Sequence, residues 1–312
     1  MGSMTGISVV IPVLNEEGSL PELLRQLKVV LGELNQPWEI IAIDDGSTDA
    51  SGTLLEEAAT EDEHIQYVQF HRNYGKSAAL NEGFRRARYD KVVTMDADLQ
   101  DDPAEIPNLV NKLEEGYDLV SGWKRHRQDP WTKTFPSKIW NRTVRWITGV
   151  KIHDFNCGLK IYRSSVTHAL EIYGGRHRYI PALAGQRKFR VGEIPVKHHP
   201  RLHGKTKYGG ARFFHGIFDL LTILFLNRFD QQPLHLFGSM GLGALVVGTV
   251  MELYLLYAKY LLGHSFKQHL ALLILGVMII LIGIQFFSIG LLGELIARTQ
   301  QHSENRVKRS LP

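Results

Sequence analysis

KVVTMDADLQDDP, residues 91–103, is the stretch that decides which fold and which chemistry this chain should have. It begins as a short run of β-branched and apolar residues, which is the pattern of a buried strand. Alternate residues of an extended chain point the same way, so Asp96 and Asp98 can converge on one cation, with the Gln100 amide oxygen on the same side. Oxygen ligands suit Mg²⁺ or Mn²⁺, and Mg²⁺ usually sits between one or two carboxylates and substrate phosphates. We therefore expect these three residues to hold a divalent metal ion.

Other apolar runs along the chain are also predicted strands, and helical patterns separate them. A leucine stripe at helical spacing, for example, extends from Leu20 to Leu31. Alternating strands and helices are typical of an α/β protein with a doubly wound, mostly parallel sheet. Parallel strands end at one edge of such a sheet, so the polar residues that follow them should gather there. The other predicted strands are residues 7–12, 38–43, 65–70, 118–122 and 191–196.

Composition limits the function classes that fit. Apolar residues make up 44% and charged residues 22% of the 312 residues, which excludes a disordered chain. The net charge of +4 suits a membrane surface or a phosphate-rich ligand and does not indicate nucleic acid, so we expect no nucleic-acid partner. The single cysteine, Cys157, excludes an internal disulfide and favours a reducing compartment. ATPase and dinucleotide-binding functions lose support because the chain lacks a P-loop and a Gly-x-Gly-x-x-Gly turn.

The last third of the chain has the character of a membrane anchor. Residues 236–262 and 270–297 each exceed the roughly 20 apolar residues that a bilayer requires. The short link between them predicts a helical hairpin, and basic residues crowd its two outer flanks. By the positive-inside rule, both chain termini are then cytoplasmic. The glycines of the first span and the acidic Glu252 favour helix association, so we expect a homo-oligomer.

These patterns predict four parts of the chain. A catalytic domain should occupy residues 5–210, and an interfacial amphipathic helix residues 211–232. Two transmembrane helices should follow within residues 233–298, and a basic cytoplasmic tail should occupy residues 299–312.

The polar clusters at the predicted strand ends suggest a site for a nucleoside diphosphate. Asp44 and Asp45 can accept hydrogen bonds from a nucleobase or a ribose, with Glu16 on the neighbouring strand end. Lys76 is placed to meet a phosphate, and the two acids of the central motif can hold a metal ion against a diphosphate. A second phosphate could be held by a basic set comprising Arg125, Arg127, Arg201, Lys205 and Lys207.

Four ordered motifs resemble those of family-2 glycosyltransferases with the GT-A fold. They are IPVLNE at residues 11–16, DDGS at 44–47, NYGK at 73–76 and DADLQD at 96–101. Together with the hairpin, they make the chain similar to the polyprenyl-phosphate glycosyltransferases, including the dolichol-phosphate mannose synthase and GtrB types. The chain departs from the family pattern at Leu14, where tyrosine is common, and at Asp102, where proline is common. The later stretch RLHGKTK, residues 201–207, is similar to the family's Arg-x-x-Gly-x-Ser-Lys.

The resemblance implies a Rossmann-like GT-A domain and a role for each matching residue. Asp154 matches an acid proposed to be catalytic, and Asp98 would act with Asp96 and Gln100 at the metal and diphosphate. Acceptor or donor phosphates would be held by Lys124, Arg125, Arg201, Lys205 and Lys207. The residues that would bind the nucleotide-sugar donor are Pro12, Leu14, Glu16, Ile43, Asp45, Lys76, Asp96 and Ala97.

The implied reaction is the inverting, metal-dependent transfer of a sugar to a polyprenyl phosphate, with undecaprenyl phosphate as the expected acceptor. Glucose from UDP-glucose is the first choice of donor; GDP-mannose or another nucleotide sugar stays open. The expected location is the cytoplasmic face of the inner (plasma) membrane. A different class of function also stays open: a non-catalytic, membrane-anchored subunit that binds a nucleotide sugar.

Overall fold

The computed structural model describes residues 4–125, 141–146, 148–170, 172, 175–199, 233–263 and 265–300. The chain divides into two compact units, Met1–Leu220 and Leu221–Pro312. The predicted amphipathic helix at 211–232 and the predicted tail beyond residue 300 lie outside the described residues.

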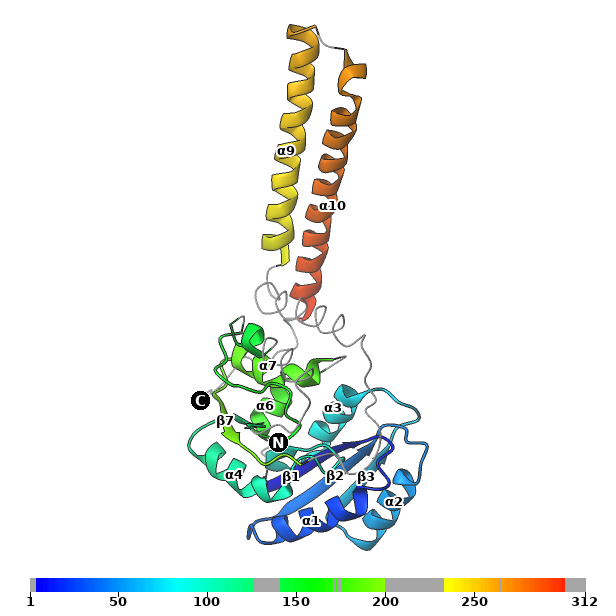
Figure 1. The fold of residues 1–312 in the computed structure, drawn as a ribbon, viewed down its shortest axis with the longest axis vertical. Helices are drawn as coiled ribbons and strands as arrows, with labels where there is room; N and C mark the ends of the chain where they lie inside the picture. The colour runs from blue at the N-terminus through cyan, green and yellow to red at the C-terminus, as the bar shows by residue number, and fades with distance from the viewer. Residues whose placement is uncertain are drawn as a thin grey trace, which may run out of the picture. The chain divides into compact units, whose positions relative to one another are not determined.

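The first unit is built on a sheet of seven strands among its described residues (Figure 1). The strand order is β3-β2-β1-β4-β6-β5-β7, and the pairs are parallel except for the two that β6 makes with β4 and β5. The predicted α/β fold with a mostly parallel sheet is therefore confirmed. The strands are β1 (Met4–Val13), β2 (Trp38–Asp44), β3 (Ile65–Gln69), β4 (Tyr89–Thr94), β5 (Leu119–Trp123), β6 (Lys160–Arg163) and β7 (Val191–Pro195).

Helices cover both faces of this sheet because its central strands are apolar on both sides. Val9 and Ile11 of β1 point into one core cluster, and Val10 between them points into the other. The first cluster is closed by α1 (Leu20–Gly32), α2 (Ser51–Glu61) and α4 (Ile106–Glu114), with the 3₁₀ turn η1 (Pro103–Glu105) ahead of α4. The second is closed by α3 (Lys76–Arg86), α6 (Ser164–Ala169) and α7 (Ile180–Gln186), with η2 (Arg176–Tyr179) ahead of α7.

Strand β6 is the one strand of the described sheet that the sequence did not reveal. It has only four residues, too few for a periodic pattern, and it runs antiparallel between β4 and β5. Its first residue, Lys160, pairs in register with Thr94 of β4 and Ser121 of β5. Because the neighbouring strands run the opposite way, β6 begins at the edge where β4 and β5 end. The loop before β6 therefore lies beside the acidic motif.

The described residues of the second unit form two long helices, α9 (Pro233–Leu261) and α10 (Leu270–Gln300), linked through the turn η3 (Phe266–His269). Each helix is long and apolar enough to cross a membrane, with a mean hydropathy of 1.7 in α9 and 2.8 in the span Lys267–Ile296. Large side chains stay exposed along both helices, for example Leu242 and Leu292 at 60% and 61%. Such an apolar surface suits lipid better than water.

Close packing between α9 and α10 uses the glycines of the predicted spans. A Cβ on Gly241 would lie 2.7 Å from the Gly283 carbonyl oxygen, and one on Gly248 would lie 2.9 Å from that of Gly276. Glycine permits this approach because it has no side chain. Gly241 and Gly248 are thus accounted for within the hairpin, whereas a Cβ on Gly243 would meet nothing within 4 Å, and oligomerisation stays a prediction. Glu252 also faces α10, near Gly276, and its buried Oε1 has no hydrogen-bond partner among the described residues.

Candidate active site

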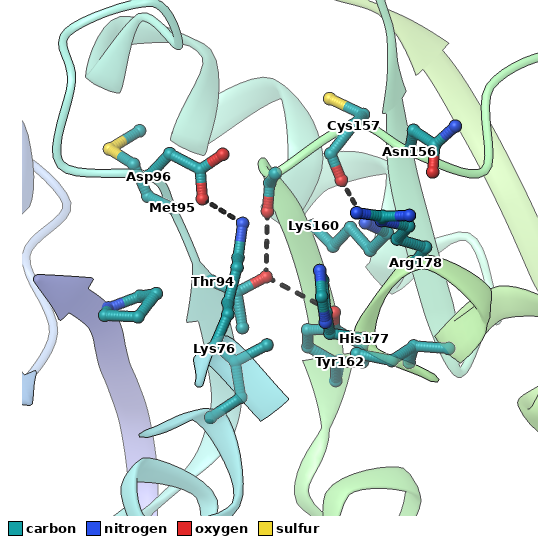
Figure 2. Close-up of a pocket in the computed structure, with 14 residues that line it drawn as sticks. Lys76, Thr94, Met95, Asp96, Asn156, Cys157, Lys160, Tyr162, His177 and Arg178 are labelled. Atoms are coloured by element: carbon teal, nitrogen blue, oxygen red, sulfur yellow. Dashed lines mark hydrogen bonds and ion pairs between the residues drawn. The ribbon is translucent and has the colours of Figure 1, made fainter. Parts of the chain in front are cut away.

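A pocket opens where β1 and β4 end and β6 begins (Figure 2). It contains Pro12 from β1, Lys76 from α3, and Asp96 from the loop after β4. The far wall comes from the loop before β6 and from η2. These segments meet because parallel strands present their carboxyl ends at one edge, which is where open α/β sheets bind ligands. The described lining consists of Pro12, Lys76, Leu80, Thr94, Met95, Asp96, Asn156, Cys157, Gly158, Lys160, Tyr162, His177, Arg178 and Ile180.

Asp96 is the only carboxylate among the described residues that line the pocket, and it forms an ion pair with Lys76. Burial alone would raise the pKa of Asp96, but the charges of Lys76, Lys124 and Lys160 hold it well below the ordinary value of 3.8. The carboxylate therefore stays ionised at neutral pH. Because its pKa is lower in the folded state, this ionisation stabilises the fold above about pH 4, and that stability is lost as the pH falls through the lowered pKa.

A second carboxylate, Asp101, converges with Asp96 on Gly158. A Cβ placed on Gly158 would lie 2.6 Å from the Asp96 Oδ2 and 2.8 Å from the Asp101 Oδ2. Asp101 is 1% exposed, and its Oδ1 lies 2.9 Å from the Lys124 Nζ. Burial lowers the pKa of Lys124, but the negative charge of Asp101 outweighs it and raises the pKa above its usual value. The sequence motif thus supplies two converging carboxylates, Asp96 and Asp101, each balanced by a lysine.

Asp98 and Gln100 follow Asp96 in the same loop. Asp98 is buried, and its Oδ1 accepts a hydrogen bond of 3.2 Å from the Gln100 backbone N–H. Gln100 is half-buried, and its carbonyl oxygen accepts a hydrogen bond of 2.9 Å from the His199 N–H. Leu99 between them has a φ of +57°, so this segment is not a regular extended chain. We grouped Asp96, Asp98 and Gln100 on one side because side chains alternate in direction along an extended chain. That alternation therefore does not continue past the strand.

The chemistry of this loop fits a divalent ion that arrives with a substrate. Among the described residues, no group of three or more histidine, cysteine, aspartate or glutamate side chains is placed to hold a metal ion. One or two carboxylates suffice for Mg²⁺ when substrate phosphates complete its shell, and Asp96 and Asp101 supply hard oxygen ligands of this kind. Binding such an ion would release Lys76 from Asp96 to meet a phosphate.

The residues expected to bind the donor base and ribose lie in different environments. Pro12 lines the pocket, and Leu14 and Glu16 are half-buried in the segment after β1. Ile43, in contrast, is completely buried in a core cluster, and Ala97 is 4% exposed in the other cluster. These two side chains pack against the protein interior.

Asp45 holds the loop that leads to Lys76. Its Oδ1 accepts a hydrogen bond of 2.7 Å from the Tyr74 N–H, and its Oδ2 accepts one of 2.9 Å from the Gly75 N–H. Burial raises the pKa of Asp45, while these two hydrogen bonds act in the opposite direction. Gly75 has a φ of +92°, a conformation that glycine adopts readily, and α3 begins at the next residue. Asp45 thereby positions the start of α3, which carries the lysine.

Comparison with known proteins decides the family. The sequence profile described as "Glycosyl transferase family 2" matches residues 8–170, more than half of the chain. The chain belongs to glycosyl transferase family 2. The resemblance drawn from the four sequence motifs is thereby confirmed.

Relatives of this family-2 glycosyltransferase cover nearly its whole length. It is 40% identical to a dodecaprenyl-phosphate galacturonate synthase of Rhizobium johnstonii, over 94% of this chain and 88% of that protein. It is also 40% identical to an undecaprenyl-phosphate 4-deoxy-4-formamido-L-arabinose transferase of Shewanella sediminis, over 94% of this chain and 87% of that protein. The matches to these relatives therefore include residues of both the first and the second unit.

Solved structures support the fold of this glycosyltransferase. Glucosyl-3-phosphoglycerate synthase from Mycobacterium tuberculosis, in complex with Mn²⁺ and UDP-glucose, superposes with a TM-score of 0.56. The match covers 72% of this chain and 79% of that chain at 19% identity. At this identity the likeness shows the GT-A-like fold alone.

The expected phosphate-binding residues of this glycosyltransferase are only partly within the described chain. Lys124 is engaged with Asp101, whereas Arg125 is exposed, with its guanidinium 5.7 Å from the Trp123 ring centroid. The expected acid Asp154 is 2% exposed, and its Oδ1 accepts a hydrogen bond of 3.0 Å from the Asn156 N–H. Arg201, Lys205 and Lys207 lie outside the described residues.

Sequence reasoning missed the basic wall of the pocket, which consists of Lys160, His177 and Arg178. Lys160 follows Gly158 closely at the start of β6, and a glycine just before a short apolar run is the one local signal that could have marked it. His177 and Arg178 lie in η2, a single turn with no hydrophobic periodicity. Burial, together with the charges of Lys76 and Arg178, lowers the pKa of His177 to about 3, so its imidazole is neutral at physiological pH.

Proposed function

We propose that this protein transfers a sugar from a nucleotide donor to a polyprenyl phosphate, with undecaprenyl phosphate as the acceptor, at a membrane surface. The observation that carries the proposal is an ionised Asp96, paired with Lys76 at the carboxyl edge of a family-2 sheet, in a chain that also has two helices able to cross a membrane. The names of the two relatives, both polyprenyl-phosphate sugar transferases, support the same acceptor class.

The proposed roles follow from the charges around the pocket. A Mg²⁺ or Mn²⁺ ion held by Asp96, with Asp98, Gln100 or Asp101 beside it, would neutralise charge that builds on the departing diphosphate. Lys76, freed from its ion pair, would contact the same diphosphate. Pro12, Leu14 and the segment around Glu16 would support the base and ribose. Transfer would invert the configuration at the anomeric carbon, because the acceptor phosphate attacks opposite the leaving nucleotide.

Asp154 would orient the reactants in this mechanism. A phosphate monoester has its second pKa near about 6, so it is already mostly a dianion at neutral pH and needs no strong base. We expect Asp154→Asn to lower kcat about tenfold, less than the 10²- to 10⁴-fold typical of losing a general base or acid. The slope of the pH–rate profile should not change. Turnover within twofold of wild type would remove Asp154 from the mechanism.

A transfer assay tests the proposed function directly. Full-length protein in detergent, undecaprenyl phosphate, Mn²⁺ and a radiolabelled sugar nucleotide should give a labelled product that partitions into organic solvent. Chelation with EDTA should abolish the product, and added Mg²⁺ or Mn²⁺ should restore it. If tight donor binding occurs without lipid labelling from any donor, the protein is a nucleotide-sugar-binding subunit and the enzymatic proposal is wrong.

The donor panel in that assay should include several sugars. UDP-glucose is the donor expected from the sequence, and GDP-mannose is the first alternative.

Protease protection of the two termini in membrane vesicles tests the proposed location, a multi-pass protein of the inner (plasma) membrane with both termini in the cytoplasm. Cross-linking in the same vesicles tests the expected homo-oligomer.

A further inference from the structure

His177 lines the pocket but has no role in the proposed mechanism. It lies in η2, and its Nδ1 is 3.1 Å from the Ser77 hydroxyl oxygen. The same hydroxyl oxygen accepts a hydrogen bond of 3.3 Å from the His177 backbone N–H. Ser77 is 3% exposed and directly follows Lys76 in the first turn of α3. These two contacts hold the imidazole beside the lysine that is proposed to contact the diphosphate.

The other ring nitrogen of His177, Nε2, is available to a ligand. Within the described part of the chain, the imidazole forms its hydrogen bond through Nδ1, and Nε2 keeps access to the pocket. Burial and the surrounding cations lower the pKa of His177 and outweigh the opposite effect of Asp96, so the ring is neutral at physiological pH. A neutral imidazole donates or accepts through Nε2, according to which nitrogen carries the proton. Nε2 is therefore an uncharged hydrogen-bonding group in a pocket whose charges come from other residues.

The sugar of a nucleotide donor is the group expected to reach Nε2. Its anomeric carbon is bonded to a diphosphate oxygen, so the sugar must lie directly beside the diphosphate. Lys76 marks the expected place of the diphosphate, and Figure 2 shows Lys76 between the dark blue strand β1 and the group that contains His177. A sugar hydroxyl both donates and accepts hydrogen bonds, so it matches Nε2 in either tautomer. A phosphate, in contrast, gains more from a charged lysine than from a neutral ring.

We propose that His177 binds a hydroxyl group of the transferred sugar through Nε2 and so helps to select the donor, with Ser77 as its positioning residue. This inference rests on the proposed transferase function. The contact with Ser77 would fix the orientation of the ring before the donor binds. A fixed hydrogen-bonding group discriminates against a sugar that lacks the matching hydroxyl, because the group is then left unpaired in the closed site.

Deoxy analogues of the donor provide the test. The parent donors are UDP-glucose, GDP-mannose and UDP-galacturonate, and each is compared with its monodeoxy analogues. Binding is measured by calorimetry with Mn²⁺ and without acceptor, and transfer to undecaprenyl phosphate is measured in parallel. In the series that binds most tightly, wild type should bind one analogue about tenfold more weakly than the parent donor, as expected when one hydrogen bond is lost.

Two substitutions of His177 separate the roles of its ring nitrogens. The asparagine amide reaches about as far as Nδ1 and can keep the contact with Ser77, so His177→Asn should fold and should lose most of the tenfold discrimination. The glutamine amide reaches about as far as Nε2, so His177→Gln should retain part of it. His168→Asn is the matched control and should discriminate as wild type does, because His168 is exposed in α6 and away from the pocket lining.

Several outcomes would overturn the inference. One is a wild type that binds every analogue as well as the parent donor, and another is the absence of binding in all three series. Unchanged discrimination in His177→Asn would also overturn it. An equal loss for the parent donor and every analogue would assign His177 to the diphosphate, and a raised KM for undecaprenyl phosphate alone would assign it to the acceptor. Discrimination that depends on His177 without lipid labelling would support the inference and refute the transferase proposal.

Discussion

Asp96→Asn should abolish sugar transfer, with kcat reduced about a thousandfold or more, as expected when a group that stabilises transition-state charge is lost. Asparagine has nearly the same shape and can still accept a hydrogen bond from Lys76. It cannot supply the negative charge that the surrounding lysines keep on Asp96 at neutral pH. The variant should also lose the binding of Mn²⁺ in the presence of nucleotide, which electron paramagnetic resonance measures without turnover.

Asp102→Asn is the control for this prediction, since it makes the same chemical change six residues along the motif. The Asp102 Oδ1 accepts a hydrogen bond of 2.9 Å from the Ala104 N–H at the start of η1. Asparagine caps a helix about as well as aspartate, so activity should stay within twofold. If Asp96→Asn retained Mn²⁺ binding and more than a tenth of wild-type activity, the ion would have to be held elsewhere.

Gly158→Ala should reduce kcat about a hundredfold, because a displacement of about 1 Å in an active site can cost that much. The added methyl group would lie within 3 Å of the Asp96 and Asp101 carboxylates, so at least one of them must move. The backbone at Gly158 has little room to retreat, since its carbonyl oxygen accepts a hydrogen bond of 3.0 Å from the Thr94 hydroxyl (Figure 2). The apparent affinity for the metal ion should fall in parallel.

The effect of Gly158→Ala should be local. The groups that must shift are side-chain ends, so thermal unfolding should change by only a few degrees, on the order expected for about 1 kcal/mol. Gly32→Ala is the matched control, because an alanine Cβ at the end of α1 would meet no atom within 4 Å and should leave activity unchanged. An active Gly158→Ala variant with normal metal affinity would show that the convergence of Asp96 and Asp101 has no catalytic role.

Most of the sheet could be predicted from the sequence because its strands are local patterns. The runs that begin at Ile7, Trp38 and Ile65 are apolar over enough residues to be recognised alone. Their alternation with helices implied the parallel arrangement and the edge at which Asp96 and Lys76 meet. The two helices beyond residue 232 could also be predicted, since their length and apolar composition are evident from the sequence alone.

The candidate site was less predictable, because its members come together through contacts distant in the chain. The motif 96–101 was recognised, but Asp101 was given no role, since an extended chain would point it away from Asp96. The positive φ of Leu99 breaks that alternation, and Asp101 reaches Gly158. A positive φ at a single loop residue cannot be predicted from the sequence pattern.

The sequence by itself determined the family, the strand–helix alternation and the acidic motif at a strand end, because each depends on residues that are neighbours in the chain. Only the tertiary structure decided that β6 enters the sheet antiparallel between β4 and β5. That insertion places Gly158 against two carboxylates and Lys160 beside them, and η2 completes the wall. A four-residue strand has too little local preference to choose its partners, so packing and hydrogen bonding with β4 and β5 decide its place.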